Sequence, residues 1–187
     1  MKRRQPSRSK VKWPKMWLMT DPRFGDDLLP AIRRLPFGSG VIFRHQHLEP
    51  EARRKMFGQV RRVCRQRGHM LILAGPEGDA LRWRADGFHL RAGVSRSPKP
   101  RSAPVHNYAE LREALRNGTD LVFISPLFPT ASHPDGKALG RLGFNALAKH
   151  AGKAAVIALG GMDRPRTLNP RLAQGWAAID ALRKNPA

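Results

Sequence analysis

Eight short apolar segments, separated by polar stretches, constrain the fold of this chain more than any other feature. Residues 121–124 and 154–159 are continuous apolar runs rich in β-branched side chains. A strand that is buried on both faces has this pattern. The other six segments, each followed by a polar, charged or small residue, are 17–20, 40–43, 70–73, 87–90, 103–106 and 175–179. We therefore expect eight buried strands, whose ends carry the residues available for chemistry.

Helical patterns lie between several of these segments. Residues 26–35, 49–67, 108–116 and 139–150 are predicted to be helices, and Glu49 and Glu110 are expected in first turns, where a carboxylate suits the helix dipole. Eight strands that alternate with helices predict an α/β fold, the (β/α)8 TIM barrel. A chain of 187 residues is short for this fold, which typically needs about 250. The helices after Gly75, Leu90 and Met162 should therefore be abbreviated.

The barrel is expected to form a single domain over residues 15–187, preceded by a basic tail at residues 1–14. Seven of the first fifteen residues are Lys or Arg and none is acidic, so the tail is expected to be mobile. No stretch approaches the roughly 20 apolar residues of a membrane span. One cysteine, Cys64, cannot form an internal disulfide, and no apolar signal sequence is evident. A cytoplasmic location is the expectation.

The net charge of +21 permits more than one interpretation. Much of the excess falls on the predicted helix 49–67, which can simply hold its arginines in solvent. No RNA-recognition aromatics, zinc ligands or helix-turn-helix pattern accompany the charge, so a nucleic-acid partner is not expected. The same field attracts a small phosphate or diphosphate ligand. The oligomeric state stays open.

Six strand ends form a recognisable order along the chain. Ser125-Pro-Leu-Phe-Pro-Thr130 is followed, at a characteristic distance, by Ile157-Ala-Leu-Gly-Gly161. The other four are Trp17-Leu-Met-Thr-Asp21, Val41-Ile-Phe-Arg44, Ala85-Asp-Gly-Phe-His89 and Val105-His106. This order resembles that of the thiamine phosphate synthase and thiazole tautomerase superfamily over about residues 15–182, and the first two motifs are the strongest part of the resemblance. The resemblance implies a role in thiamine biosynthesis.

In this family, the synthase joins a pyrimidine methyl diphosphate to a thiazole phosphate and releases pyrophosphate. The resemblance implies that Arg44 binds the diphosphate and that Thr130 and Ser132 supply hydroxyls to the diphosphate and the thiazole. It also implies that the backbone amides of Gly160 and Gly161 approach the thiazole phosphate.

Several departures concern the cations that accompany a diphosphate. Gln46 replaces a family lysine, and His133 replaces another, for which it can provide a donor. Ala74-Gly75 and 90–94 stand where the family has the aspartates that carry Mg²⁺. Losing both removes the hard oxygen ligands that this ion requires. No protein metal site is predicted, and Mg²⁺ is expected only with a diphosphate substrate, held by its oxygens and by Asp21 or Asp180.

The histidines have different expected roles. His106 stands where the tautomerase has its acid/base histidine, but a histidine at a barrel rim can equally be a structural donor. His89 is expected to hold the rim. His45 and His47 face the same way, but no third ligand of suitable spacing follows them.

Three functions of different classes remain open. The first is a divergent thiamine phosphate synthase, with Arg44 and His106 as catalytic candidates. The second is a metal-free isomerase like the tautomerase, acting through His106. The third is a non-catalytic or regulatory barrel, which binds either a phosphorylated ligand or, through residues 1–15 and the basic helix 49–67, nucleic acid. Whether the chain is an enzyme is not decided by its sequence.

Overall fold

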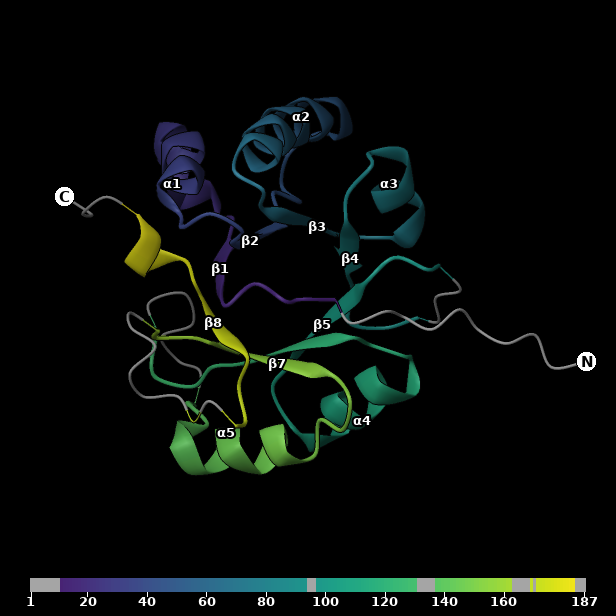
Figure 1. The fold of residues 1–187 in the computed structure, drawn as a ribbon, viewed down its shortest axis with the longest axis vertical. Helices are drawn as coiled ribbons and strands as arrows, with labels where there is room; N and C mark the ends of the chain where they lie inside the picture. The colour runs from purple at the N-terminus through teal and green to yellow at the C-terminus, as the bar shows by residue number, and fades with distance from the viewer. Residues whose placement is uncertain (1–10, 94–96, 131–136, 163–168, 170, 184–187) are drawn as a thin grey trace, which may run out of the picture.

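Eight parallel strands form a closed barrel in the order β1-β2-β3-β4-β5-β6-β7-β8, with helices around the outside (Figure 1). The computed structural model describes residues 11–93, 97–130, 137–162, 169 and 171–183. Every neighbouring pair is parallel, including β1 with β8, which closes the barrel. The eight-stranded TIM barrel is confirmed.

The strands are β1 (Met16–Met19), β2 (Gly40–Phe43), β3 (Met70–Ala74), β4 (Gly87–His89), β5 (Arg101–Val105), β6 (Leu121–Ile124), β7 (Ala155–Leu159) and β8 (Gly175–Ala178). The helices are α1 (Leu28–Arg34), α2 (Pro50–Gln66), α3 (Glu77–Arg82), α4 (Tyr108–Arg116) and α5 (Gly140–Lys149), with short 3₁₀ segments η1 (Pro22–Asp27) and η3 (Asp180–Leu182).

A tryptophan fills the centre of the barrel. Trp17 is fully buried, its indole nitrogen donates to the Pro14 carbonyl at 2.8 Å, and its ring meets Phe123 edge to face at 5.4 Å. Gly40 makes room for this ring, because a Cβ there would lie 2.1 Å from the indole. The interior is therefore packed through, and ligands are confined to the ends of the barrel.

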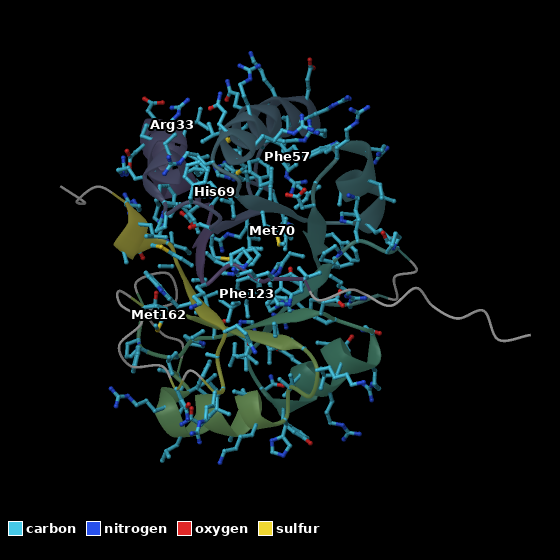
Figure 2. All side chains as sticks on the ribbon, in the orientation of Figure 1. Arg33, Phe57, His69, Met70, Phe123 and Met162 are labelled. Atoms are coloured by element: carbon cyan, nitrogen blue, oxygen red, sulfur yellow. The ribbon has the colours of Figure 1, made fainter. Side chains whose placement is uncertain are left out.

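The outer layer divides into two sides. Figure 1 shows α1, α2 and α3 on one side of the ring of strands and α4 and α5 on the other. Figure 2 places Phe57 and His69 between the α1 and α2 helices and the barrel. On the second side, Leu111 of α4 and Phe144 of α5 belong to a separate buried cluster.

Three local predictions needed correction. The fifth strand begins at Arg101, not at residue 103, because the Arg101 guanidinium is buried and donates to the carbonyls of Gly93 and Asn117. The predicted helix 26–35 is a 3₁₀ segment followed by α1. Glu49 is the residue before the first turn of α2, whereas Glu110 lies in the first turn of α4 as expected.

Abbreviation accounts for the short chain. The helix after β3 has only six residues, and no helix follows β4 within the described residues of 90–100. Most of the segment after Met162 lies outside the described ranges. None of the described helices has the length and apolar character needed to traverse a bilayer.

Candidate active site

A cavity of about 260 Å³ lies at the carboxyl ends of the strands. It is lined by Arg44, His106, Ser125, Pro126, Thr130, Leu159, Gly160, Gly161, Met162, Ala178, Ile179, Asp180 and Ala181. The structure thus brings together five of the seven residues proposed from the sequence. The other two, Ser132 and His133, lie outside the described residues.

Arg44 is held in place from the end of β1. Its backbone N–H donates to the Thr20 hydroxyl at 2.9 Å, its Nε donates to the Thr20 carbonyl at 2.7 Å, and Nη2 donates to Asp21 at 2.8 Å. Burial lowers the pKa of Arg44, and the Asp21 carboxylate opposes that shift. Among the described residues nothing accepts a hydrogen bond from Nη1. A fixed guanidinium with a free edge suits an anionic ligand.

Asp21 and Asp180, the two acids considered for a metal, are themselves bound by arginines. Asp21 accepts from the backbone and Nε of Arg23, and Asp180 accepts from Arg23 at 2.8 Å and from Arg183 at 3.4 Å. Burial alone would raise the pKa of Asp21, but its hydrogen bonds to Arg23 and the charges of Arg23 and Arg44 hold it below its ordinary value. Both acids therefore already have cationic partners within the protein.

A guanidinium lies at the ends of β2 and β3, beside Ala74-Gly75, where the resemblance implies that metal ligands have been lost. Arg53 of α2 donates to the Arg44 carbonyl at 2.9 Å and to the Ala74 carbonyl at 2.6 Å, which ties the ends of β2 and β3. Between the end of β3 and Glu77 there is no carboxylate. After β4, the described residues of 90–100 contain none either. A cation that binds backbone carbonyls here disfavours Mg²⁺, which needs oxygen ligands of its own. The residues present do not fit a magnesium ion.

This role of Arg53 is not visible in the sequence. The pattern of α2 groups it with solvent-facing arginines, although its side chain is partly buried and its guanidinium lies 5.3 Å from the Trp83 ring. Its position one turn into the helix that follows β2 indicates that it could reach the strand ends. However, only the packing of α2 distinguishes Arg53 from the exposed Arg54.

His106 forms a pair with Glu110. Nδ1 of His106 lies 2.8 Å from Oε2 of Glu110, and the His106 backbone N–H donates to the same oxygen at 2.8 Å. Because an ionised carboxylate only accepts, Nδ1 carries a hydrogen, and in the neutral form of the ring Nε2 then has the lone pair. Arg91 donates to the other oxygen of Glu110 at 2.8 Å. A histidine oriented in this way can accept or deliver a proton at Nε2.

The ionisation of Glu110 supports this pair. Burial alone would raise the pKa of Glu110, but hydrogen bonds from His106 and the charges of His106 and Arg91 hold it below its ordinary value. The sequence pattern assigns Glu110 only to the helix dipole. His106 directly follows β5, and Glu110 lies four residues later in the first turn of α4. This spacing is the sequence signal that could have identified Glu110 as the partner of His106.

The glycine pair is required by close packing. Gly160 and Gly161 have φ values of 95° and 61°, and a Cβ on Gly161 would lie 2.5 Å from the Pro129 carbonyl oxygen. The loop after β6 therefore lies directly against the end of β7, where the Phe128 amide donates to the Gly160 carbonyl at 3.1 Å. This contact brings Thr130 and the glycines to one wall of the cavity. The phosphate role of the glycine amides stays a prediction.

The other rim histidines are held neutral. Burial lowers the pKa of His45 to about 4 and that of His89 to about 3. His45 contacts the Thr20 hydroxyl at 2.9 Å, and His89 contacts the Ser102 hydroxyl at 2.9 Å. His47 is exposed. Across the described ranges, no group of three or more His, Cys, Asp or Glu side chains is arranged to hold a metal.

Comparisons with known proteins agree with this architecture. The model of the thiamine monophosphate synthase family matches residues 26–182. The chain is 30% identical to the thiamine-phosphate synthase of Bordetella avium over 151 residues, which cover 72% of this chain and 70% of that protein. It is 23% identical to that of Prochlorococcus marinus over 172 residues, which cover 86% of this chain and only 48% of that protein. The chain thus spans about half the length of the second relative.

A solved structure shows the same fold. The thiamine phosphate pyrophosphorylase from Pyrococcus furiosus superposes with a TM-score of 0.74 at 22% identity, over 89% of this chain and 85% of that chain. The family model covers most of the present chain, from residue 26 through β2–β8, and includes the ends of β6 and β7. The chain therefore belongs to the thiamine monophosphate synthase family.

Proposed function

We propose that this protein is a thiamine phosphate synthase that works without a metal site of its own. The main support for this proposal is that Arg44 lines the same cavity as Thr130 and the Gly160–Gly161 pair. A cation and a set of small polar groups thus share one site. This arrangement suits two phosphorylated substrates bound side by side.

In the proposed reaction, the C–O bond between the pyrimidine methyl group and the diphosphate breaks. Its electron pair leaves with pyrophosphate, and the thiazole nitrogen then forms a C–N bond with the pyrimidine cation. Arg44 stabilises the charge that develops on the leaving group, because a fixed donor costs no reorganisation at that moment. Thr130, the glycine amides, Ser132 and His133 are assigned to phosphate binding on the family pattern.

The test is an assay of thiamine phosphate formation from pyrimidine methyl diphosphate and thiazole phosphate, with EDTA and with added Mg²⁺. We expect product under both conditions. Arg44→Ala should lower kcat/KM by about 10- to 150-fold, the equivalent of a charged hydrogen bond. Arg112→Ala, on the exposed side of α4, is the matched control and should retain activity. An absolute need for Mg²⁺ would contradict the metal-free assignment.

A second candidate function rests on the His106–Glu110 pair. It is an isomerase that moves a proton next to an imine of a thiazole phosphate, with Nε2 of His106 as acid and base. The test measures exchange of substrate hydrogen with deuterium from solvent. Exchange that is lost in His106→Ala, without any synthase product from the unaltered protein, would favour this function. Ligand binding without either reaction would favour a regulatory barrel.

A further inference from the structure

Helix α2 exposes a group of cations that have no acidic partner. Arg54, Lys55, Arg62 and Arg65 are exposed, and Arg61 is partly exposed. No ion pair in the described residues joins any of these five to a carboxylate. By contrast, the arginines around the cavity, such as Arg23 and Arg44, are paired. The five cations, here named the α2 face, therefore add their charge without compensation.

The helix arranges these cations on its outward side. Arg54, Arg61 and Arg65 are separated by seven and four residues, which places them on one face, and Lys55 and Arg62 follow the same spacing beside them. The opposite side of α2 packs on the barrel through Phe57, Val60 and Val63. Figure 2 shows nitrogen-tipped side chains projecting outward from α1 and α2. A helix of 17 residues offers this charge over about 25 Å.

An exposed aromatic ring lies at the carboxyl end of the same helix. Phe37 is 69% exposed, and the Arg67 guanidinium lies 4.4 Å from the centre of its ring. The Gly38 amide donates to the Arg67 carbonyl at 3.2 Å, which fixes the Phe37 turn against the end of α2. An exposed aromatic ring is thus held beside a cation at the end of the basic helix, with its position fixed by the Phe37 turn.

We propose that the α2 face and Phe37 bind single-stranded nucleic acid, a partner that the sequence alone does not lead us to expect. A row of cations along the backbone with an aromatic ring for base stacking is the common arrangement of proteins that bind such strands without sequence preference. The predominance of arginine favours phosphate contacts. One Phe offers little apolar area for insertion into a lipid surface or for burial against an acidic protein. This surface contains none of the residues that line the cavity, so the proposal is independent of the proposed catalytic function.

The test is fluorescence anisotropy of the full chain with a labelled single-stranded RNA of about 20 nucleotides, titrated at several KCl concentrations between about 50 and 200 mM, the range over which phosphate contacts weaken measurably. The main variant is Arg62→Glu with Arg65→Glu. The matched control is Arg112→Glu with Arg116→Glu, which makes the same change of charge at exposed positions of α4, on the other side of the barrel. Melting temperatures are compared first, and the Gln versions of both pairs serve if a Glu version does not fold.

We expect the α2 variant to weaken binding at least ten-fold and to reduce the slope of log K against log salt by about 1.4, because each lost phosphate contact contributes about 0.7 for a single strand. The α4 control should change binding less than three-fold. Phe37→Ala should weaken binding by about ten-fold with the salt slope unchanged, since stacking is not ionic.

Equal weakening by the two charge-changed pairs would overturn the proposal, because it would show that net charge alone attracts the RNA. Undetectable binding of the unaltered protein at the lowest KCl concentration would overturn it as well. Tighter binding to phosphatidylserine vesicles or polyglutamate than to RNA would reassign the surface. The α2 variant should retain synthase activity, so the failure of either proposal is visible separately.

Discussion

The two halves of the barrel have kept different parts of the family pattern. In the half from β5 to β8, the loop after β6 packs on the glycine pair after β7 and forms one wall of the cavity. In the half from β1 to β4, the ends of β2 and β3 carry no metal ligand and are tied together by Arg53. The difference indicates that the wall formed by the ends of β6 and β7 is constrained by close backbone packing, whereas the ends of β2 and β3 are held by hydrogen bonds from an arginine side chain.

The largest expected effect tests the packing of the second half. Gly161→Ala should lower the free energy of unfolding by roughly 2–5 kcal/mol, because the new methyl group meets the Pro129 carbonyl and the backbone is left-handed. Gly75→Ala is the comparison in the first half. It also has a positive φ, but its nearest neighbour is the flexible Arg53 side chain at 3.9 Å. Urea unfolding should show a clearly smaller loss for Gly75→Ala, and equal losses would remove the distinction.

The first half should also lose stability in mild acid. Burial lowers the pKa values of His45, His69 and His89 below 6.5, so the folded state keeps them neutral while the unfolded state takes up protons. Stability is therefore lost as pH falls from about 6.5 towards 4, by about 1.4 kcal/mol per pH unit for each of His45 and His89, and His69 adds to the loss in the same direction. His45 alone would contribute about 3 kcal/mol over this range. Urea unfolding between about pH 7 and pH 5 measures the slope.

Substitution of His45 tests how much of this pH dependence of the free energy of unfolding comes from that residue. His45→Asn should reduce it by about one proton, because the remaining shifts belong to the other two buried histidines. Asp21 and Glu110 have lowered pKa values and lose their contribution only at lower pH. A free energy of unfolding that stays constant over the same pH range would show that the buried histidines are not neutral.

Arg53→Ala is expected to have an intermediate effect. It removes hydrogen bonds from a guanidinium to the carbonyls of Arg44 and Ala74 and should cost about 2–3 kcal/mol of stability. Arg54→Ala, one position along the same helix, is exposed and unpaired and should cost less than about 0.5 kcal/mol. Thermal unfolding compares the two. If Mg²⁺ bound only to Arg53→Ala, this would show that Arg53 excludes the ion from the ends of β2 and β3. Similar stability of both variants would argue against a role of Arg53 in holding these two strand ends together.

The smallest expected effect concerns the His106–Glu110 pair. Glu110→Gln keeps the shape of the side chain but removes its charge, and should cost about 1 kcal/mol of stability. The ¹⁵N chemical shifts of the His106 ring report which nitrogen carries the hydrogen, and the share with the hydrogen on Nδ1 should fall in the variant. An unchanged distribution would mean that another group orients the ring.

The barrel can be predicted from the amino-acid sequence alone. Apolar runs such as 121–124 and 154–159 can only be buried on both faces, and the residues after them must then meet at one end of the barrel. That requirement alone is enough to place Arg44, His106, Thr130 and the glycine pair together. The same pattern does not predict that Arg101 begins β5, because a charged residue interrupts an apolar run. In the structure, backbone carbonyls accept hydrogen bonds from its guanidinium and make its burial possible.

Which charged side chains are paired cannot be predicted from the sequence and depends on the tertiary contacts. Arg53 and Arg54 are neighbours in the sequence with the same side chain, yet one binds two strand ends and the other faces solvent. Glu110 likewise became a partner of His106 through the way that α4 meets β5. Such pairing depends on distances of a few ångströms between elements that are far apart in the chain, and the energy of a charge changes with burial and neighbours over the same distances. Hydrophobic periodicity specifies the elements, but it carries no information about these contacts.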